Sequence, residues 1–467
     1  MKIATRPEGK VSFKALFEPR NIAVIGSFKE VLMGGYGVTK SLLDFGFSGN
    51  IYPVNPVYSE TLGMKVYPTA DQVPDVIDLA IIVTPPSAVP TVIGQCAQRG
   101  AKAAIIVSDG FAEASKEGAI LQHEVVDIAH RNGMRLIGPN TIGIINTANG
   151  LVTTPYFTGY DRIQRGAVAY SSQTGIIGAQ ALPYEDYACP VSKMCDFGNK
   201  CDLNEIDLLE YLADDPETKV IAIHTEDIKD GRKFMDVAQR IAANKPVLVL
   251  KPGRNEASAK AVASHTGSLA GNDQIYENAF KQAGVIRVDT WQEFLEIPKV
   301  FASQPLPQGN RIAVFTVSGA AGIMAIDAAA EHGLIAAQLS STTTDKLSMI
   351  SPRLARNPVD AGQVWTIVTD FIPTIEPMIT TLLGDSNVDC ILLILWTSST
   401  AQTLALVDMF QRLKPQFSKP MTVWLYGPKL SCKEELSREL ETLGVPTYLN
   451  LETAAKALGI AANCNRR

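Results

Sequence analysis

The sequence lacks the marks of several large classes of protein. Its 467 residues include seven cysteines, an odd number with no Cys-x-x-Cys pair, so reduced thiols in the cytoplasm are expected rather than a disulfide framework. No apolar run approaches the roughly 20 residues of a membrane span, and the first ten residues lack the apolar core of a secretory signal. With a net charge of −6 and no basic cluster, nothing indicates a nucleic-acid or membrane surface.

Several catalytic motifs are also absent. There is no Gly-x-x-x-x-Gly-Lys-Ser/Thr loop, no Gly-x-Ser-x-Gly elbow of an α/β-hydrolase, and no strict Gly-x-Gly-x-x-Gly dinucleotide fingerprint. The closest cysteines, Cys189, Cys195 and Cys201, have a six-residue spacing that matches no common zinc pattern, and no histidine lies near them. We therefore expect no metal on this chain and no nucleotide site of these types.

What the sequence contains is an alternation of apolar, β-rich runs with helical patterns, which predicts parallel, doubly wound α/β sheets. At roughly 150 residues a domain, the length suggests about three domains. The expected strands fall into three series: 21–26, 50–55, 78–83, 103–108 and 134–138; then 167–170, 220–224 and 246–250; then 311–315, 390–395 and 421–425. The connector 303–310, rich in proline and glycine, indicates a boundary before the third series.

The second and third series open alike. Residues 167–178 ("AVAYSSQTGIIG") and 312–323 ("IAVFTVSGAAGI") each combine a strand, a turn of hydroxyl residues and glycine, and a helix start. An internal duplication explains this likeness, and so does the general occurrence of such turns in doubly wound domains. Both explanations stay open.

Glycines follow the first expected strand. The chain turns at Gly26 and Ser27 and passes a glycine-rich stretch, 34–37, before a helix expected to begin near Thr39. Glycine lets a backbone approach pyrophosphate, whose charge suits a helix N-terminus. We therefore expect this turn to bind a phosphate-bearing ligand.

The ends of the next two strands favour coenzyme A over NAD. A dinucleotide site needs an acidic residue at the end of the second strand to hold the ribose hydroxyls, whereas neutral residues there tolerate a phosphorylated ribose. The proline pair after the third strand either forms a rigid rim of the ligand crevice or only ends the strand. The residues concerned are Val54, Asn55 and Pro56 after the second strand, and Val83, Thr84, Pro85 and Pro86 after the third.

Taken together, the motifs resemble those of one family. In chain order they are "AVIG", "YPVNP", "IIVTPP", "GPNTIG", "YSSQTG", "FGNKCDLNEIDLLEYLADDPETKVIAI", "EDIKDGRKFMDVAQRI" and "SHTGSLAG". This order is similar to that of the α subunit of ADP-forming acyl-CoA synthetases (acetate–CoA ligases), which are relatives of succinyl-CoA synthetase. The resemblance covers about residues 12–460, is most specific over 197–287 and is weakest in the last third.

The resemblance implies an α/β fold of three doubly wound domains. They are a Rossmann-like CoA-binding domain (1–150), a succinyl-CoA synthetase-like flavodoxin domain with a phosphohistidine loop (151–304), and a second domain of that flavodoxin type (309–467). ATP or ADP and Mg²⁺ are then expected on a separate ATP-grasp β subunit. The CoA site is expected at Gly26, Ser27, Val54, Asn55, Pro56, Val83, Thr84 and Pro85.

In that family a histidine of the second domain is phosphorylated during turnover, and the motif "SHTGSLAG" (264–271) nominates His265. A neutral imidazole is a competent nucleophile toward phosphorus near neutral pH. We expect its small neighbours to leave it in a mobile loop, so that it can carry phosphate between two sites. The alternative is an exposed loop histidine without a role.

Two groups are expected to serve that histidine. The turn Ser172, Gln173, Thr174, Gly175 offers N–H groups at a helix start to a phosphate, and is similar to the Ser-x-Ser-Gly turn of relatives. Glu226 aligns with a glutamate of the family and is expected to face the imidazole as base or orienting acid. His224 and Asp227 replace the family's usual aromatic residue and glycine. The alternatives are a helix cap and solvated loop acids.

Two further regions bear on the substrate. In "GPNTIG", Thr141 stands where relatives usually have cysteine, and Asn140 either donates hydrogen bonds to a substrate carboxylate or phosphate or belongs to a linking turn. The third domain departs from the family at 317–320 and 361–365. If it shapes the acyl pocket or a subunit contact, the acid is expected to differ from acetate.

The expected activity interconverts acyl-CoA, phosphate and ADP with a carboxylic acid, CoA and ATP, through an acyl phosphate and a phosphohistidine. We expect a cytoplasmic hetero-oligomer that binds neither nucleic acid nor membrane. The alternative, a CoA-binding regulatory module, predicts a lost histidine or an acetyltransferase segment, and neither is recognised in this sequence. An NAD-dependent dehydrogenase is disfavoured by Asn55 and the missing fingerprint.

Overall fold

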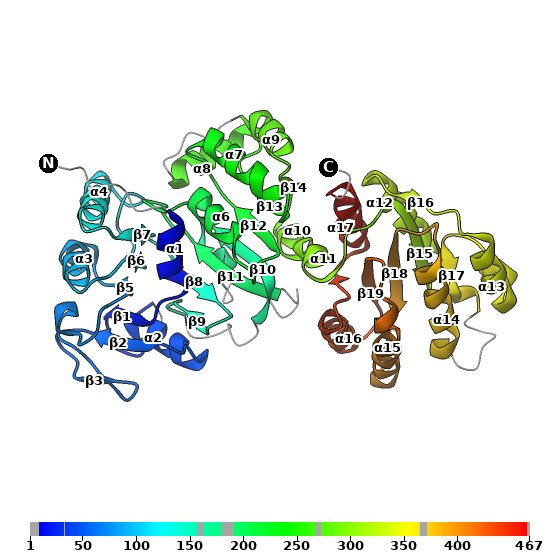
Figure 1. Ribbon diagram of the computed structural model, residues 1–467, viewed down its shortest axis with the longest axis horizontal. Coiled ribbons are helices and arrows are strands. Elements are labelled where there is room, and N and C mark those ends of the chain that lie inside the picture. Colours follow the sequence, from blue (N-terminus) through cyan, green and yellow to red (C-terminus); the bar gives the residue numbers. More distant parts are fainter. Residues whose placement is uncertain are drawn as a thin grey trace. The chain divides into compact units, whose positions relative to one another are not determined.

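The computed structural model describes residues 9–31, 33–156, 163–178, 190–266, 272–364 and 371–464. They form an α/β structure with three main sheets (Figure 1). The described residues up to 290 make one compact unit that holds two of these sheets, and those from 291 onward make a second unit around the third. The predicted α/β class is confirmed.

The first sheet is fully parallel, in the order β2-β1-β5-β6-β7. Side chains alternate between its faces, because successive Cβ atoms of a strand point to opposite sides. Ile22 and Val24 pack on the side of α1 and α2, and Ala23 and Ile25 on the side of α3 and α4 (Figure 1). The strands are β1 (Asn21–Gly26), β2 (Asn50–Val54), β5 (Leu79–Val83), β6 (Ala103–Ile106) and β7 (Arg135–Ile137). The other elements are α1 (Gly9–Phe17), α2 (Gly35–Asp44), β3 (Glu60–Thr61), β4 (Met64–Lys65), η1 (Ala70–Gln72), η2 (Pro86–Ala88), α3 (Val89–Gln98) and α4 (Lys116–Arg131).

The second sheet has the order β14-β13-β12-β10-β11-β8-β9, and only β8 and β9 run antiparallel to their neighbours. Its strands are β8 (Ile144–Asn146), β9 (Leu151–Val152), β10 (Gln164–Ser172), β11 (Pro190–Asp196), β12 (Val220–His224), β13 (Val247–Leu250) and β14 (Ile286–Val288). Its helices are η3 (Gly175–Ile177), α6 (Glu205–Ala213), α7 (Gly231–Ala242), α8 (Glu256–Thr266) and α9 (Asp273–Gln282).

Helix α1 joins the first two sheets into one unit. Its Phe13 and Phe17 stack on Tyr211 of α6, with ring centroids 6.0 and 5.5 Å apart, and Phe13 meets the ring of Phe197 edge-on. These rings belong to one buried cluster that runs from the first sheet to the second. Burial of so much aromatic surface holds the two sheets together.

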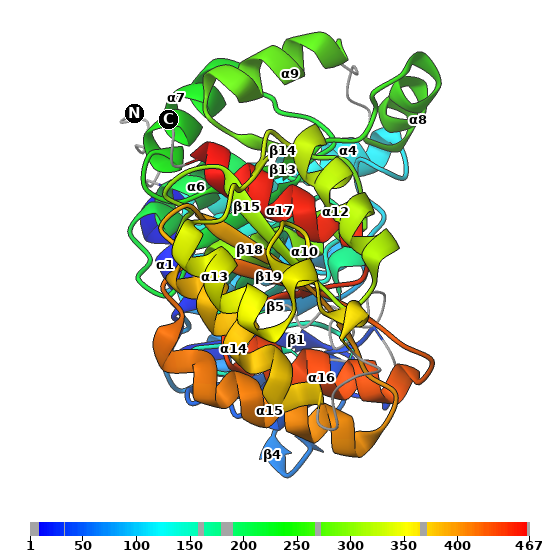
Figure 2. The same ribbon diagram turned by 90° about the vertical axis from the view of Figure 1, so that its right-hand side faces the viewer.

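The third sheet has the order β16-β15-β18-β19-β20, with β17 paired to β15. Figure 2 shows α12 and α17 on one side of it and α14, α15 and α16 on the other. The strands are β15 (Arg311–Thr316), β16 (Ile335–Ala336), β17 (Val359–Asp360), β18 (Cys390–Trp396), β19 (Met421–Tyr426) and β20 (Thr447–Tyr448). The helices are α10 (Trp291–Glu296), α11 (Pro298–Ser303), α12 (Gly319–Glu331), α13 (Ser341–Ile350), η4 (Pro352–Leu354), η5 (Ala361–Gln363), α14 (Phe371–Gly384), α15 (Thr400–Leu413), η6 (Lys414–Gln416), α16 (Leu430–Thr442) and α17 (Leu451–Cys464).

Helices α10 and α11 precede the proline-rich connector 303–310 but pack with the third sheet. Lys299 forms a buried ion pair with Glu441 of α16 at 3.0 Å, and Glu296 accepts the backbone N–H of Leu449 at 2.9 Å. A buried lysine needs such a partner, because an isolated charge is costly to desolvate. The contacts therefore divide the chain between residues 290 and 291.

Numbered in chain order, the parallel strands of the first two sheets are arranged 2-1-3-4-5, the order of flavodoxin-like domains, and so are those of the third sheet when the two-residue β17 is left aside. The second and third sheets therefore agree with an internal duplication. Since the first sheet has the same order, strand order does not separate duplication from general likeness. Both explanations stay open.

Candidate active site

The carboxyl ends of three neighbouring strands of the first sheet carry the residues predicted to bind CoA. The register pairs Ile25 with Val54 and Gly26 with Val83, so β2, β1 and β5 end side by side. Open α/β sheets bind ligands in the crevice beyond such ends. This edge brings together Gly26, Ser27, Val54, Asn55, Pro56, Val83, Thr84 and Pro85.

A side chain at Gly26 would have no room. A Cβ there would lie 2.8 Å from the carbonyl oxygen of Val83 and 3.2 Å from the nitrogen of Gly35. Helix α2 begins at Gly35, four residues before the expected start near Thr39, because Gly34 is extended and ends the preceding loop. The first turn of α2 thus lies against the end of β1, which is the close approach that a phosphate cradle requires.

Asn55 braces this turn. Its Nδ2 donates to the carbonyl oxygen of Gly26 at 2.8 Å, and its Oδ1 accepts the backbone N–H of Val57 at 2.8 Å. A carboxylate has no N–H to offer Gly26 and would leave that carbonyl without this donor. The hydrogen bond to Gly26 is therefore a structural reason for the neutral Asn55 at the end of β2. It stands beside the predicted effect of Asn55 on the choice between CoA and NAD.

The rim after β5 leaves a polar atom unpartnered. The hydroxyl of Thr84 is buried and has no hydrogen-bond partner among the described residues, while its carbonyl accepts the hydroxyl of Ser108 at 2.5 Å. Buried hydroxyls nearly always have a partner. A polar group of a ligand at this edge has a hydrogen-bonding partner in the Thr84 hydroxyl. The closely packed glycine backbone at Gly26 suits a phosphate.

A second set of loops meets at the carboxyl edge of β10, β11 and β12. Ser172 ends β10, and its carbonyl accepts the N–H of Phe197, which follows β11, at 2.8 Å. Its hydroxyl accepts the N–H of Thr174 at 3.0 Å and lies 2.9 Å from Nδ1 of His224, which ends β12. The predicted phosphate turn, 172–175, therefore lies beside the predicted Glu226 loop.

Within the described residues, a single 3-10 turn follows this predicted phosphate turn, and residues 179–189 lie outside the described residues. Helix η3 covers only Gly175–Ile177, and the extended backbone of Thr174 before it and of Gly178 after it bounds this short turn on both sides.

Glu226 lies in the loop after β12 and is only 9% exposed. Its backbone N–H donates to Oε1 of Gln173 at 2.8 Å. Asp227 accepts from Nε2 of Gln173 at 2.9 Å and pairs with the ammonium of Lys200 at 3.1 Å. The loop is therefore tied to the phosphate turn, and neither acid is a fully solvated loop residue.

The loop of Asn140 and Thr141 joins the same edge. Thr141 donates its hydroxyl to the carbonyl oxygen of Asp196, and the Asp196 carboxylate accepts the N–H of Ile142 at 2.8 Å. Asn140 is exposed and has a left-handed φ of 58°, which asparagine tolerates better than most residues. A Cβ on Gly175 would lie 3.0 Å from Ile142, so this loop contacts the phosphate turn directly.

Buried charged and basic groups surround this edge. Burial raises the pKa of Asp196 to about 6. Burial, then the charges of Lys251 and Lys200, lowers the pKa of His224 to about 3, so that this imidazole is neutral at physiological pH. The Lys251 ammonium lies 4.7 Å above the ring of Tyr276 and donates to the carbonyl of Pro252 at 2.8 Å.

Sequence reasoning assigned no role to Asp196, Lys200 or Lys251. Lys251 directly follows the predicted strand 246–250, so a polar residue after a predicted strand is the signal that finds it. Asp196 ends β11 and Lys200 lies four residues further on, and the sequence does not predict that strand. Lys200 also has a left-handed φ of 53°, which no sequence pattern predicts.

The histidine motif is helical where the sequence predicts a loop. Ser264, His265 and Thr266 form the last turn of α8, because the preceding run "EASAKAVA" (256–263) is rich in strong helix formers. The rest of the motif, 267–271, lies outside the described residues. Strands β12 and β13 pair with His224 opposite Leu250, so the Glu226 loop and the segment that leads into α8 leave the same edge.

The second unit has its own polar cluster at the carboxyl ends of β15 and β17, which pair Thr316 with Asp360. Thr316 accepts the N–H of Ser318 at 2.9 Å, and Asp360 accepts Nε2 of Gln363 at 3.0 Å. A Cβ on Gly319 would lie 3.0 Å from the Asp360 carboxylate. The two departures from the family, around Ser318 and after Asp360, therefore lie together, and Trp365 lies outside the described residues.

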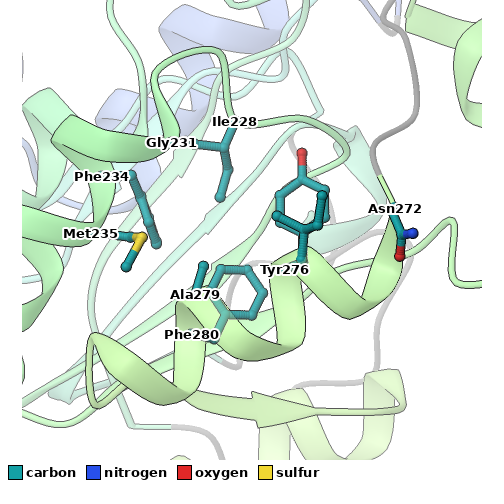
Figure 3. A pocket seen from close by; sticks show the side chains of 9 residues that line it. Ile228, Gly231, Phe234, Met235, Asn272, Tyr276, Ala279 and Phe280 are labelled. Atoms are coloured by element: carbon teal, nitrogen blue, oxygen red, sulfur yellow. The ribbon is translucent and has the colours of Figure 1, made fainter.

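An apolar cleft of about 280 Å³ lies between α7 and α9 (Figure 3). It begins at Ile228, two residues after Glu226, but it lies between helices and not at the strand ends. We do not include it in the candidate site. Its lining is Ile228, Gly231, Phe234, Met235, Asn272, Ile275, Tyr276, Ala279 and Phe280.

The described ranges hold neither a metal-binding cluster nor a membrane-spanning helix. No cluster of three or more His, Cys, Asp and Glu side chains that could hold a metal occurs there. Within the same ranges, none of the helices combines the length and apolar character needed to cross a membrane.

Comparison with known proteins decides the family. The family described as CoA binding domain matches residues 20–147, and the family described as succinyl-CoA ligase like flavodoxin domain matches residues 165–301. The alpha subunit of ADP-forming acetate–CoA ligase II of Pyrococcus furiosus is 38% identical over 454 residues, which cover 94% of this chain and 95% of that subunit. This chain belongs to the ADP-forming acyl-CoA synthetases.

A second relative of this synthetase chain is longer. The ADP-forming acetate–CoA ligase II of Archaeoglobus fulgidus is 36% identical over 95% of this chain, which spans only about two thirds of that relative, 66% of its length. The synthetase chain therefore corresponds to the alpha part of the family.

A solved structure agrees with both matches. The dinucleotide-forming acetyl-coenzyme A synthetase 1 of Ca. Korarchaeum cryptofilum, solved with phosphate and ADP, superposes with a TM-score of 0.86 at 32% identity, covering 97% of each chain. The predicted family and the predicted class of acid–thiol ligase are confirmed. The comparisons support a ligase and not the regulatory-module alternative.

Proposed function

We propose that this chain is the alpha component of an ADP-forming acyl-CoA ligase that works with an ATP-grasp β subunit. Phosphate attacks the acyl-CoA carbonyl and CoA leaves as its thiol, giving an acyl phosphate. A ring nitrogen of His265 then attacks phosphorus and the carboxylate leaves. Finally ADP on the partner takes the phosphoryl group from the histidine, giving ATP. Because the acyl phosphate and the phosphohistidine are both high-energy species, metabolite levels set the direction.

One observation carries this proposal. The phosphate turn 172–175, the Glu226 loop and the segment leading into α8 all leave the carboxyl edge of the adjacent strands β10, β12 and β13. The predicted phosphate turn and the Glu226 carboxylate thereby lie at one edge, and the segment that leads to His265 starts from the same edge. This is the constellation that a phosphohistidine cycle needs.

Glu226 is proposed to orient the imidazole of His265 and to stabilise the positive charge that forms when the ring nitrogen attacks phosphorus. Its low exposure supports this role, because a carboxylate in a less polar site interacts more strongly with a cation than one in water.

The phosphate is proposed to rest on the turn of Ser172, Gln173, Thr174 and Gly175, with backbone N–H groups and the Thr174 hydroxyl as donors. Asn140 and Thr141 are proposed to lie next to the reacting centre. The contact of Gly175 with Ile142 supports that position, and the exposed Asn140 amide has the donors that a carboxylate or phosphate accepts.

Coenzyme A is proposed to bind at the edge of the first sheet, on Gly26, Ser27, Val54, Asn55, Pro56, Val83, Thr84 and Pro85. The close approach of β1 and α2 at Gly26 and the unpartnered hydroxyl of Thr84 support this site. The nucleotide and Mg²⁺ are proposed to belong to the partner. The described cysteines form no disulfide with one another, which supports a reducing, cytoplasmic setting.

The test is the phosphate on His265. The chain is purified from its own host with its copurifying partner, given Mg²⁺ and ATP, and analysed by mass spectrometry under alkaline handling, with His265→Ala as control. Phosphate on His265 that is discharged by CoA and an acid supports the cycle. No phosphate, despite a copurifying ATP-grasp subunit, rejects it in favour of a CoA-binding regulator.

A second experiment examines Glu226. Glu226→Gln keeps the side-chain shape and removes the charge, so the rate of His265 phosphorylation is expected to fall by about 10²-fold or more. The affinity for CoA, measured by calorimetry, is expected to stay unchanged because that site lies on the first sheet. An unchanged phosphorylation rate would remove Glu226 from the proposal.

A further inference from the structure

The side-chain amide of Gln173 joins the phosphate turn to the Glu226 loop. Gln173 is 7% exposed. Its Nε2 donates to Oδ1 of Asp227 at 2.9 Å. Its Oε1 accepts the backbone N–H of Glu226 at 2.8 Å, and lies within 3.3 Å of further donors on Thr225, Asp227 and Lys200. One buried amide thus contacts three successive residues of the loop.

Lys200 holds the other side of the same loop. Its ammonium donates to the carbonyl oxygen of Asp227 at 2.6 Å and forms ion pairs with the carboxylates of Asp227 at 3.1 Å and Glu205 at 3.0 Å. The Lys200 side chain is 1% exposed, so these partners are needed to offset its desolvation. The loop backbone is therefore bound through its N–H groups by Gln173 and through a carbonyl by Lys200.

We infer that Gln173 is a positioning residue, which fixes Glu226 relative to the phosphate turn and does not hold phosphate with its side chain. The inference rests on the proposed function, because the turn and Glu226 acquire their roles there. Since the buried amide is turned toward residues 225–227, the backbone of the turn is what meets the phosphate. A single side chain then sets the separation of carboxylate and phosphate.

Position matters here because a displacement of about 1 Å can cost on the order of 10²-fold in rate. The turn and the loop are also linked through Ser172 and His224 at 2.9 Å. Loss of Gln173 is therefore expected to loosen the loop without unfolding it.

The first test measures the loop itself. Gln173→Met keeps a side chain of similar length and removes both hydrogen-bonding ends. Hydrogen exchange of the full chain with its partner is followed by mass spectrometry. We expect exchange of peptides covering 225–228 to rise by about tenfold while β12, at 220–223, is unchanged. Gln239→Met, on the exposed face of α7, is the matched control and should change neither. Unaltered exchange of the loop in Gln173→Met overturns the inference.

The second test asks whether Gln173 acts through Glu226. The rate of His265 phosphorylation by Mg-ATP is measured in a double-mutant cycle of Gln173→Met and Glu226→Gln. We expect Gln173→Met to slow the reaction by about 10²-fold when Glu226 is present, and by less than about threefold in the Glu226→Gln background. Equal losses in both backgrounds would show that Gln173 acts independently and overturn the inference.

A reciprocal swap tests the donor and acceptor directly. Gln173→Glu sets two carboxylates against each other and is expected to slow phosphorylation. Adding Asp227→Asn restores one donor and one acceptor with their direction reversed, and leaves one negative charge on the pair of residues 173 and 227, as in the unmodified chain. We expect the double variant to be faster than Gln173→Glu, and failure to improve contradicts the inference. If the unmodified chain takes no phosphate, the proposed function fails, and hydrogen exchange still decides whether Gln173 anchors the loop.

Discussion

The hydroxyl oxygen of Ser172 lies 2.9 Å from Nδ1 of His224, and both residues are buried at the ends of adjacent strands. The sequence resemblance leads us to expect an aromatic residue at position 224. Histidine keeps a ring there and adds a polar contact to the predicted phosphate turn. This contact links the end of β12 to the turn after β10.

The burial of the His224 imidazole predicts that the protein loses stability as the pH falls. The pKa of His224 is lowered to about 3 by burial, whereas in the unfolded chain it has its ordinary value near 6.5. Between these values the unfolded chain binds a proton that the folded chain does not, so the free energy of unfolding falls as the pH falls below 6.5. Between pH 7.5 and pH 5 the loss from this one group is about 2 kcal/mol.

His224→Phe removes that titration. We expect the variant to lose about 2 kcal/mol less stability than the unmodified chain between pH 7.5 and pH 5, as measured by urea unfolding at both pH values. Comparing the two proteins isolates His224, because all other titrating groups are shared. Parallel pH dependence of the two chains would contradict the prediction.

The packing at the proposed CoA site predicts that position 26 tolerates no side chain. Gly26→Ala would place a Cβ 2.8 Å from the carbonyl oxygen of Val83 in β5 and 3.2 Å from the nitrogen of Gly35 in α2, so β1 must shift away from both at the proposed phosphate site. We expect the dissociation constant for CoA, measured by calorimetry, to rise by about tenfold or more, which is about 1.4 kcal/mol.

Gly94→Ala is the matched control for Gly26→Ala. Gly94 lies inside α3, and an added Cβ there meets nothing within 4 Å. This variant should bind CoA normally and be stabilised by about 0.5–1 kcal/mol, because alanine favours a helix over glycine. Equal CoA affinities of the two variants would remove Gly26 from the site.

Two substitutions of Asn140 distinguish a role of its backbone conformation from a role of its side chain. Its φ of 58° suits glycine, and it costs alanine about 1 kcal/mol. If the exposed amide donates to the substrate, Asn140→Gly and Asn140→Ala should both lower kcat/KM by about tenfold, although Asn140→Gly keeps the turn relaxed. Steady-state kinetics with melting temperatures for both variants decide this. Full activity of Asn140→Gly would assign Asn140 to the turn alone.

Much of this architecture follows from the sequence. The apolar run 21–26 coincides with β1, and the other ten expected strands all overlap observed ones, because uninterrupted apolar runs are typical of parallel strands buried on both faces. The convergence of Gly26, Asn55 and Thr84 follows equally, since parallel strands end at a common edge. Strand β11 was not expected, because Ser192 and Lys193 interrupt its apolar pattern.

The parts that sequence reasoning misses depend on tertiary contacts. Lysine is rarely buried, so nothing in the sequence predicts that Lys200 lies between Glu205 and Asp227. The side chain of Gln173 points to the Glu226 loop and not outward, which only the packing of adjacent loops determines. Helix α8 extends through His265 because local helix propensity outweighs the small residues that suggest a loop.

The polar cluster of the second unit bears on the acid that the enzyme uses. Thr316 and Asp360 lie at paired strand ends, Ser318 donates its N–H to Thr316, and both turns fall in the segments where the sequence resemblance is interrupted. We expect an acid other than acetate to give the highest kcat/KM in a panel of short, branched and aromatic acids. Acetate as the best substrate by a wide margin would contradict this expectation.

Asp360→Asn then distinguishes the two ways in which this cluster could act. One carboxylate oxygen of Asp360 accepts the N–H of Gly362 and the other accepts Nε2 of Gln363. Asparagine has a similar shape but only one acceptor oxygen, so one of these hydrogen bonds is lost and the turn after β17 is expected to shift. If the second unit shapes the acyl pocket, the ranking of acids by kcat/KM changes while the affinity for the partner subunit is constant. If it forms the subunit contact, the dissociation constant of the complex rises and the ranking is kept. An unchanged ranking together with unchanged assembly would exclude the cluster from both roles, because Asp360 organises the turn through both of its carboxylate oxygens.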